Sequence, residues 1–151
     1  MGAALIAVIH KSMDHIYNSA RKILEKGVVE ASAPCRIDSG GTWDIKSLAL
    51  PLERIKPATV NMALNLRARV TLSPFEDGRV RIRSSGFRQQ EESSMDQIPF
   101  NSTFGIFFAA ASYFGFHGLT VDIRSEFPVK SALGGSSTAL VALIKALSRA
   151  R

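Results

Sequence analysis

The order of elements over residues 119–151 most constrains the fold. Leu119–Ser125 alternates apolar and polar residues, as a half-buried strand does. Pro128 and a run of small residues follow, and Gly-Gly-Ser-Ser at 134–137 then opens an amphipathic helix that reaches the chain end. We expect a serine of this run to cap that helix. Any fold of this chain must therefore contain a strand, a loop of small residues and a helix in that order.

Upstream segments predict further strands and a core helix. Phe100–Phe116 holds six of the nine phenylalanines and predicts the central helix, with Phe104, Phe107, Phe108 and Ala111 on one stripe. Asp77-Gly78 is a hairpin signal, and the polar segment Gln89–Gln97 predicts a loop. An amphipathic helix is expected at Met13–Lys26. The other strands are expected at 28–33, 59–66 and 79–84.

Paired strands followed by a loose alternation of helices and strands predict an α+β domain with a mixed, partly antiparallel sheet packed against helices. A chain of 151 residues suits one domain with its own core. We assign residues 13–151 to that domain and leave 1–12 unassigned. The last helix ends at Arg151 with no cap and no following element, so we expect a truncated chain.

The composition and net charge of the chain limit the kinds of ligand and partner that we expect it to bind. The net charge of +6 fits an anionic ligand such as a nucleotide, and it also fits RNA. Cys35 is the single cysteine, which excludes an internal disulfide and indicates a reducing, cytoplasmic location. The apolar run at residues 3–9 is too short to span a bilayer, so no membrane partner is expected.

The stretch Pro128–Ser137, PVKSALGGSS, is a candidate phosphate loop. A helix N-terminus presents unpaired N–H groups and a partial positive charge, and glycines allow an anion to approach closely. Serine hydroxyls there can donate to phosphate or ligate Mg²⁺. A plain helix cap after a glycine turn is the alternative. The run is not a Walker A loop, because no lysine precedes the serine as that motif requires.

This stretch resembles the second motif of the GHMP kinases, Pro-x-x-x-Gly-Leu-Gly-Ser-Ser. Two positions depart: Ala132 stands for the first glycine and Gly135 for the first serine, while Ser136 keeps the second serine. The resemblance implies ATP and Mg²⁺ as cofactors, with Ser136 on the metal. The implied ATP-binding residues are Lys130, Ser131, Ala132, Leu133, Gly134, Gly135, Ser136 and Ser137.

A second segment, Ala33–Asp44 (APCRIDSGGTWD), is similar to the opening motif of the same family and closest to its fucokinase and heptose-7-phosphate kinase branch. The resemblance implies that Arg36 is a catalytic charge partner of the transferred phosphoryl group. It also implies that Asp44 binds the sugar substrate, together with Gly41 and Trp43. An Asx-turn role for the aspartate and a surface role for the arginine are the alternatives.

The resemblance implies ATP-dependent phosphoryl transfer to a sugar or sugar-phosphate hydroxyl by a GHMP-type kinase. In that family the catalytic Asp and the third glycine-rich motif lie downstream of the second motif. We therefore expect this chain to lack the C-terminal domain and to be inactive by itself. It is then expected to self-associate through the surface that domain would cover.

Two alternatives of other classes stay open. An RNA-binding module of similar fold would use a basic stripe on two strands, although no aromatic residues interleave with it and nucleic acid is the less favoured partner. The stripe comprises Arg67, Arg69, Arg79, Arg81 and Arg83. A non-catalytic sensor or subunit that kept the fold and lost the reaction is the other alternative, and the two motif departures are compatible with it.

Overall fold

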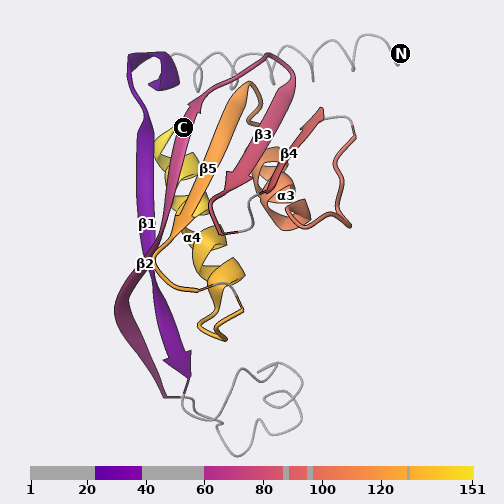
Figure 1. The fold of residues 1–151 in the computed structure, drawn as a ribbon. Coiled ribbons are helices and arrows are strands. Elements are labelled where there is room, and N and C mark those ends of the chain that lie inside the picture. The colour runs from indigo at the N-terminus through magenta and orange to yellow at the C-terminus, as the bar shows by residue number, and fades with distance from the viewer. Residues whose placement is uncertain (1–22, 39–59, 87–88, 95–96, 129) are drawn as a thin grey trace, which may run out of the picture.

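The computed structural model describes residues 23–38, 60–86, 89–94, 97–128 and 130–151. They form a five-stranded sheet with two helices on one face (Figure 1). The elements in chain order are β1 (Val29–Asp38), β2 (Asn61–Pro74), β3 (Arg79–Ser84), β4 (Gln89–Ser94), α3 (Gly105–Tyr113), β5 (Leu119–Ser125) and α4 (Gly135–Arg149). The mixed sheet packed against helices confirms the α+β architecture expected from the sequence.

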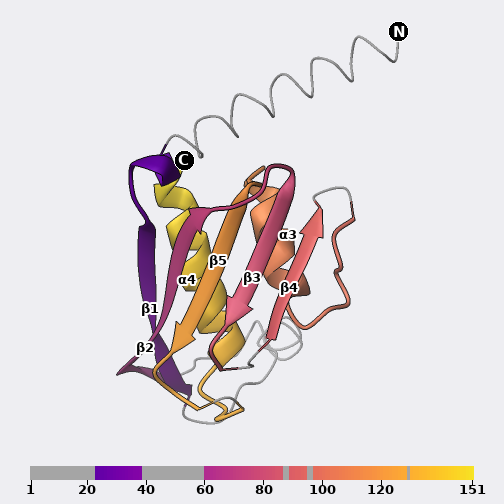
Figure 2. The same cartoon turned by 45° about the horizontal axis from the view of Figure 1, so that its top comes forward.

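The sheet runs in the order β1-β2-β5-β3-β4 (Figure 2). All neighbouring pairs are antiparallel except β3 and β5, which are parallel. Asp77-Gly78 does form a turn between β2 and β3, with Gly78 at φ +70°. The hairpin expected there is wrong, however, because β5 inserts between the two strands and pairs with both.

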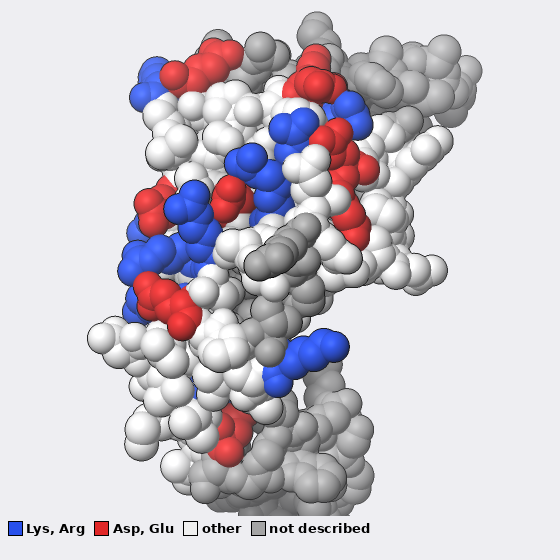
Figure 3. Space-filling model, viewed as in Figure 1, with Lys and Arg blue, Asp and Glu red and all other residues white. Residues whose placement is uncertain are grey.

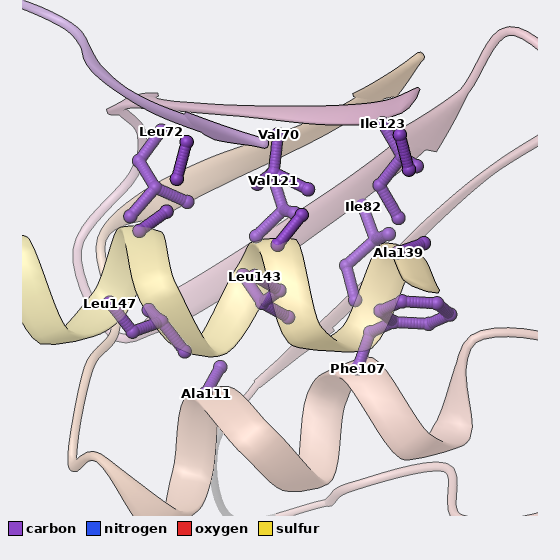
Figure 4. Close-up of a cluster of buried hydrophobic side chains, with 14 of the residues drawn as sticks. Val70, Leu72, Ile82, Phe107, Ala111, Val121, Ile123, Ala139, Leu143 and Leu147 are labelled. Carbon is purple, nitrogen blue, oxygen red and sulfur yellow. The ribbon is translucent and has the colours of Figure 1, made fainter. Parts of the chain in front are cut away.

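The core lies between the sheet and the helices (Figure 4). The alternation of β3 and β5 places Val80, Ile82 and Val121 in it with no exposed surface. Helix α4 contributes a stripe of small and large residues, and Leu143 and Leu147 from this stripe are fully buried. Burial of a leucine or valine side chain contributes about 1.5–3 kcal/mol, so each of these side chains stabilises the packing of the helices on the sheet.

Helix α3 is shorter than the expected 100–116 segment, but its predicted stripe is correct. Phe104, Phe107, Phe108 and Ala111 are all buried. The helix begins at Gly105, where a Cβ atom would lie 2.7 Å from the carbonyl carbon of Phe100. Only glycine fits here, because the preceding turn folds its backbone directly against the first residue of the helix.

The first half of β2 departs from the sequence expectation. Alternation over 59–66 puts Val60, Met62, Leu64 and Leu66 on one face of a half-buried strand, yet Val60 and Met62 are 72% and 67% exposed. This part of β2 pairs with β1 alone, with Ile37 opposite Met62. It runs past the rest of the sheet (Figure 1). The strand therefore forms as its alternation predicts, but this part of its apolar face extends past the helices, so the helices do not cover it.

Strand β4 is a second departure. Its sequence QQEESS has no strand propensity and was expected to form a loop. It pairs along its whole length with β3, from Arg79 opposite Ser94 to Ser84 opposite Gln89. Pairing with an ordered neighbour outweighs local propensity here, because the strand lies at the sheet edge and needs no apolar alternation.

Candidate functional site

The loop of the candidate phosphate motif joins β5 to α4. Strands β3 and β5 are parallel, with Ser84 opposite Ile123, so both end at the same edge of the sheet. The loop leaves β5 at that edge and returns as the first turn of α4 (Figure 1). Ligands of α/β sheets bind outside the carboxyl ends of parallel strands. The topology therefore puts the sequence motif where such a site is expected.

The backbone of this loop alternates between left-handed and other conformations. Lys130, Ala132 and Gly134 have φ of 61°, 58° and 70°, whereas the residues between them, Ser131 and Leu133, do not have positive φ. Left-handed residues that alternate with right-handed ones turn successive N–H groups toward one side and form a concave anion-binding nest. Positive φ at every second position of this loop is the feature that it shares with such a nest.

Helix α4 begins without a side-chain cap. Gly134 is the N-cap residue in the left-handed conformation, and its carbonyl accepts a 2.8 Å hydrogen bond from the N–H of Thr138. The expectation that Ser136 or Ser137 caps the helix is wrong, because both serines lie inside the first turn. Their side chains are exposed. Neither hydroxyl therefore makes a capping hydrogen bond to the helix backbone. The first turn of α4 also contains no acidic residue that would repel an anion.

Gly135, the departure from the kinase motif at the first serine, has a packing explanation. A Cβ atom built on it would lie 3.2 Å from Cε2 of Phe127. The Phe127 ring is itself buried, with 6% of its surface exposed. A side chain at position 135 would thus be in tight contact with an aromatic ring from the other end of the loop, and the ring would have to shift slightly to accept it.

A cavity of about 430 Å³ opens beside this loop. Its apolar lining includes the rings of Phe104, Phe107 and Phe127. The polar uncharged residues of the lining all carry hydroxyl groups: Ser84, Thr103, Ser125, Ser131, Ser136 and Ser137. Among the described residues of the lining, Lys130 is the one cation and none is a carboxylate. The cavity is therefore suited to a ligand with an apolar ring at one part and an anion at another.

The sequence motif located only one side of this cavity. Residues from β3, β5 and α3 complete it, among them Ser84, Thr103 and Phe107. No local pattern distinguishes these residues from ordinary strand-end and helix residues. The pairing of β3 with β5 was the missing information, because it brings Ser84 to within reach of a loop some 45 positions later.

Two other predicted site residues, Arg36 and Leu133, are not among the residues that line the cavity. Arg36 lies on β1, where one guanidinium nitrogen is 3.2 Å from a carboxylate oxygen of Asp38. Gly41, Trp43 and Asp44 lie outside the described residues. The structure thus places seven of the eight predicted ATP-binding residues around one cavity. Their role in binding ATP, like the role of the sugar-binding residues, stays a prediction.

Mg²⁺ is usually bound by one or two carboxylates together with phosphate oxygens and water. In the described residues no group of three or more His, Cys, Asp and Glu side chains lies together. The exposed hydroxyl of Ser136 at the cavity is a suitable oxygen donor. The described residues of the cavity could therefore supply one ligand, Ser136, to a metal ion that is otherwise held by phosphate.

The outer face of the sheet bears the arginines of the alternative RNA-binding reading (Figure 3). They share this face with carboxylates, and most are paired: Arg69 with Glu126, Arg79 and Arg81 with Glu92, and Arg83 with Asp122. The guanidinium of Arg81 also lies 3.9 Å from the centre of the Phe75 ring. The basic stripe is therefore largely neutralised within the sheet, and this weakens the case for a phosphate-binding surface here.

Comparisons with known proteins give the class of the fold. Residues 101–151 match the sequence profile described as GHMP kinases N terminal domain. The matched part includes α3, β5, the loop and α4, which are the elements that form most of the cavity. No curated protein sequence is significantly similar to the chain. In the described part of the chain, no helix is long and apolar enough to cross a bilayer.

Three solved structures share the fold. Mevalonate kinase of Methanococcus jannaschii superposes with a TM-score of 0.61 at 17% identity, over 80% of this chain and 39% of that one. A D-glycero-D-manno-heptose 1-phosphate kinase of Bacteriodes thetaiotaomicron gives 0.61 at 20% identity, over 79% and 40%. Lactococcus lactis galactokinase, solved with galactose, gives 0.57 at 14% identity, over 92% and 35%.

The fold is accordingly that of the N-terminal domain of GHMP kinases. The chain spans about 40% or less of the length of each of these three structures. Identities at or below 20% place the similarity at the level of fold. The three proteins act on different substrates by name, so the fold does not select one branch of the family.

Proposed function

We propose that this chain is the nucleotide-binding domain of an ATP-dependent small-molecule kinase of the GHMP type. The observation that carries the proposal is the cavity beside the 130–137 loop, which combines an apolar ring-lined part, an anion nest and a helix N-terminus. Such a combination suits a nucleoside triphosphate, because the base needs apolar contacts and the phosphates need N–H donors. The sequence match over residues 101–151 supports the same assignment.

The transferred group would be a phosphoryl group, for which catalysis consists mainly of positioning and charge neutralisation. The loop N–H groups would hold the phosphates, and the Ser136 hydroxyl would serve as one ligand of Mg²⁺. A sugar or sugar phosphate is the acceptor we propose, because two of the three similar kinases named above are a heptose 1-phosphate kinase and a galactokinase. We also propose that the acceptor is a small molecule and that the protein is cytoplasmic.

Nucleotide binding is the decisive test. Isothermal titration calorimetry with Mg²⁺·ATP, ADP and adenosine should show binding that weakens as phosphates are removed, because the loop supplies donors to the anion. ATP that binds no more tightly than adenosine would contradict the phosphate role of the loop. A coupled ADP-release assay with galactose, a heptose phosphate and mevalonate then tests the acceptor class, and turnover with mevalonate alone would refute the proposed sugar acceptor.

A further inference from the structure

We infer that Arg149 and Pro34 close one edge of the sheet to a strand from a second copy of this chain. In the part of the chain that the structure describes, β1 is the terminal strand of the sheet and pairs with β2 alone. Unpaired backbone groups along a sheet edge are a template on which another chain can add a strand, and folded proteins block such edges with proline or charged side chains. The inference is independent of nucleotide binding.

The two edges of the sheet differ in how readily they would accept another strand. Strand β4 has six residues, QQEESS, which include two glutamates and have low strand propensity. Strand β1 has ten residues, and its inner face carries Ala31, Ala33 and Cys35, each 5% exposed or less. A long strand with regular alternation is the better template, so β1 is the edge that needs a specific block.

Hydrogen bonds of Arg67 on β2 show which backbone groups of β1 point outward. The N–H of Arg67 donates to the Glu126 carboxylate over 2.9 Å, and its C=O accepts the Glu126 N–H over 3.0 Å. Both groups therefore point toward the β5 side and away from β1. This direction alternates from residue to residue in an antiparallel ladder. The next residue, Ala68, consequently points toward β1, where its partner is Ala33.

Arg149 occupies one of the outward-pointing groups of β1. By the alternation that sets Ala33 toward β2, the backbone N–H and C=O groups of residues 30, 32 and 34 point away from β2. The Nη1 atom of Arg149, in the last turn of α4, donates a 2.6 Å hydrogen bond to the carbonyl oxygen of Glu30. A charged donor forms a stronger hydrogen bond than a neutral N–H does. A strand that added at this edge would have to displace it.

Pro34 removes a donor from the same edge, because proline has no backbone N–H. An added strand would form its ladder with every second residue of β1, here Glu30, Ser32 and Pro34. The carbonyl of the first is already bonded to Arg149, and the N–H of the third is missing. Ser32 thus lies between two incomplete positions, so an added strand cannot form complete pairs of hydrogen bonds at two successive positions.

The test removes each block separately and includes a matched control. Arg149→Ala frees the Glu30 carbonyl, and Arg149→Lys keeps a cationic donor. Pro34→Thr adds the missing N–H with a residue that favours strands. Arg124→Ala is the control, because this arginine lies on β5, its side chain is 74% exposed, and its loss changes the net charge equally. Light scattering after size exclusion, over a concentration series, gives the association state of each variant. Hydrogen exchange measures the protection of the amides at residues 29–34.

We expect Arg149→Ala to self-associate at concentrations about tenfold or more below those of the wild-type chain, because association no longer breaks a hydrogen bond from a charged donor. Pro34→Thr should associate at concentrations about fivefold lower, which corresponds to one ordinary hydrogen bond. In both variants the Ser32 amide should exchange more slowly as the protein concentration rises, because it is then bonded to the added strand. Arg149→Lys and Arg124→Ala should match the wild type in both measurements.

Three results would overturn the inference. The first is association of Arg149→Ala and Pro34→Thr that equals that of the wild type. The second is stronger association without slower exchange of the Ser32 amide, because the contact would then lie on another surface. The third is equal association of Arg124→Ala, which would assign the effect to net charge. Circular dichroism checks that each variant is folded. If Arg149→Ala does not fold, Pro34→Thr decides the test, since it leaves the hydrogen bond of Arg149 to Glu30 in place.

Discussion

Replacement of Ala132 by glycine should stabilise the protein, which is the opposite of what a glycine usually does. Ala132 has φ of 58°. A left-handed alanine costs about 1–2 kcal/mol because its Cβ crowds the following carbonyl oxygen. Glycine removes that cost but adds about 0.5–1 kcal/mol of backbone entropy to the unfolded chain. The balance is a gain of up to about 1.5 kcal/mol, with a midpoint of about 0.75 kcal/mol, which would raise the melting temperature by about 1.5–3 °C at the midpoint for a domain of this size.

Ala109→Gly in α3 is the matched control. It is the same substitution at a half-buried position in regular right-handed helix, where glycine should lower the free energy of unfolding by about 1 kcal/mol. Equilibrium urea unfolding of the wild type and both variants measures the difference directly. If Ala132→Gly is destabilised as much as Ala109→Gly, then Ala132 is not left-handed in solution, and the alternating loop on which the phosphate nest depends is not formed.

Three further predictions concern residues outside the candidate site. Gly105→Ala should destabilise the domain by about 1–3 kcal/mol in urea unfolding, since the new methyl group would displace the backbone of Phe100; wild-type stability would contradict the packing of the α3 start. The backbone N–H of Arg67 and the guanidinium of Arg69 hold the pKa of Glu126 below its ordinary value of 4.5. The stabilisation from this carboxylate is present above that pH and is lost as pH falls through the lowered pKa, so Glu126→Gln should flatten the acid limb of stability below about pH 4.5. A structured RNA should show no binding in a gel-shift assay at physiological salt, because the sheet arginines are already paired, and a tight salt-resistant shift would restore the RNA-binding alternative.

The two departures from the kinase motif now have different physical consequences. Ala132 occupies a left-handed position that favours glycine, so it costs stability and leaves the backbone path intact. Gly135 avoids a tight contact with the neighbouring Phe127 ring, so it costs a hydroxyl group and leaves the packing intact. Neither departure closes the cavity, which is compatible with retained nucleotide binding. A fold-retaining sensor would show the same cavity and would differ from a kinase in its turnover.

Local patterns were sufficient wherever an element is shaped by its own periodicity. The alternation of Arg79–Ser84 and Leu119–Ser125 predicted β3 and β5 with their bounds, and the phenylalanine stripe predicted the buried face of α3. The loop sequence likewise located the candidate phosphate site. These features depend on residues that lie within about a dozen positions of one another, and the physical cause is therefore visible in the chain itself.

Tertiary pairing decided the remainder. The insertion of β5 between β2 and β3, the recruitment of the polar segment β4 and the exposure of Met62 all depend on which strand lies beside which. The same pairing brings the rings and hydroxyl groups of three distant segments to the loop and makes a cavity from it. Periodicity specifies which face of a strand is apolar, but only the arrangement of neighbours determines whether that face is covered. The sequence by itself thus determined the loop that is a candidate for binding phosphate, and the tertiary structure determined that a ring-lined cavity lies beside it.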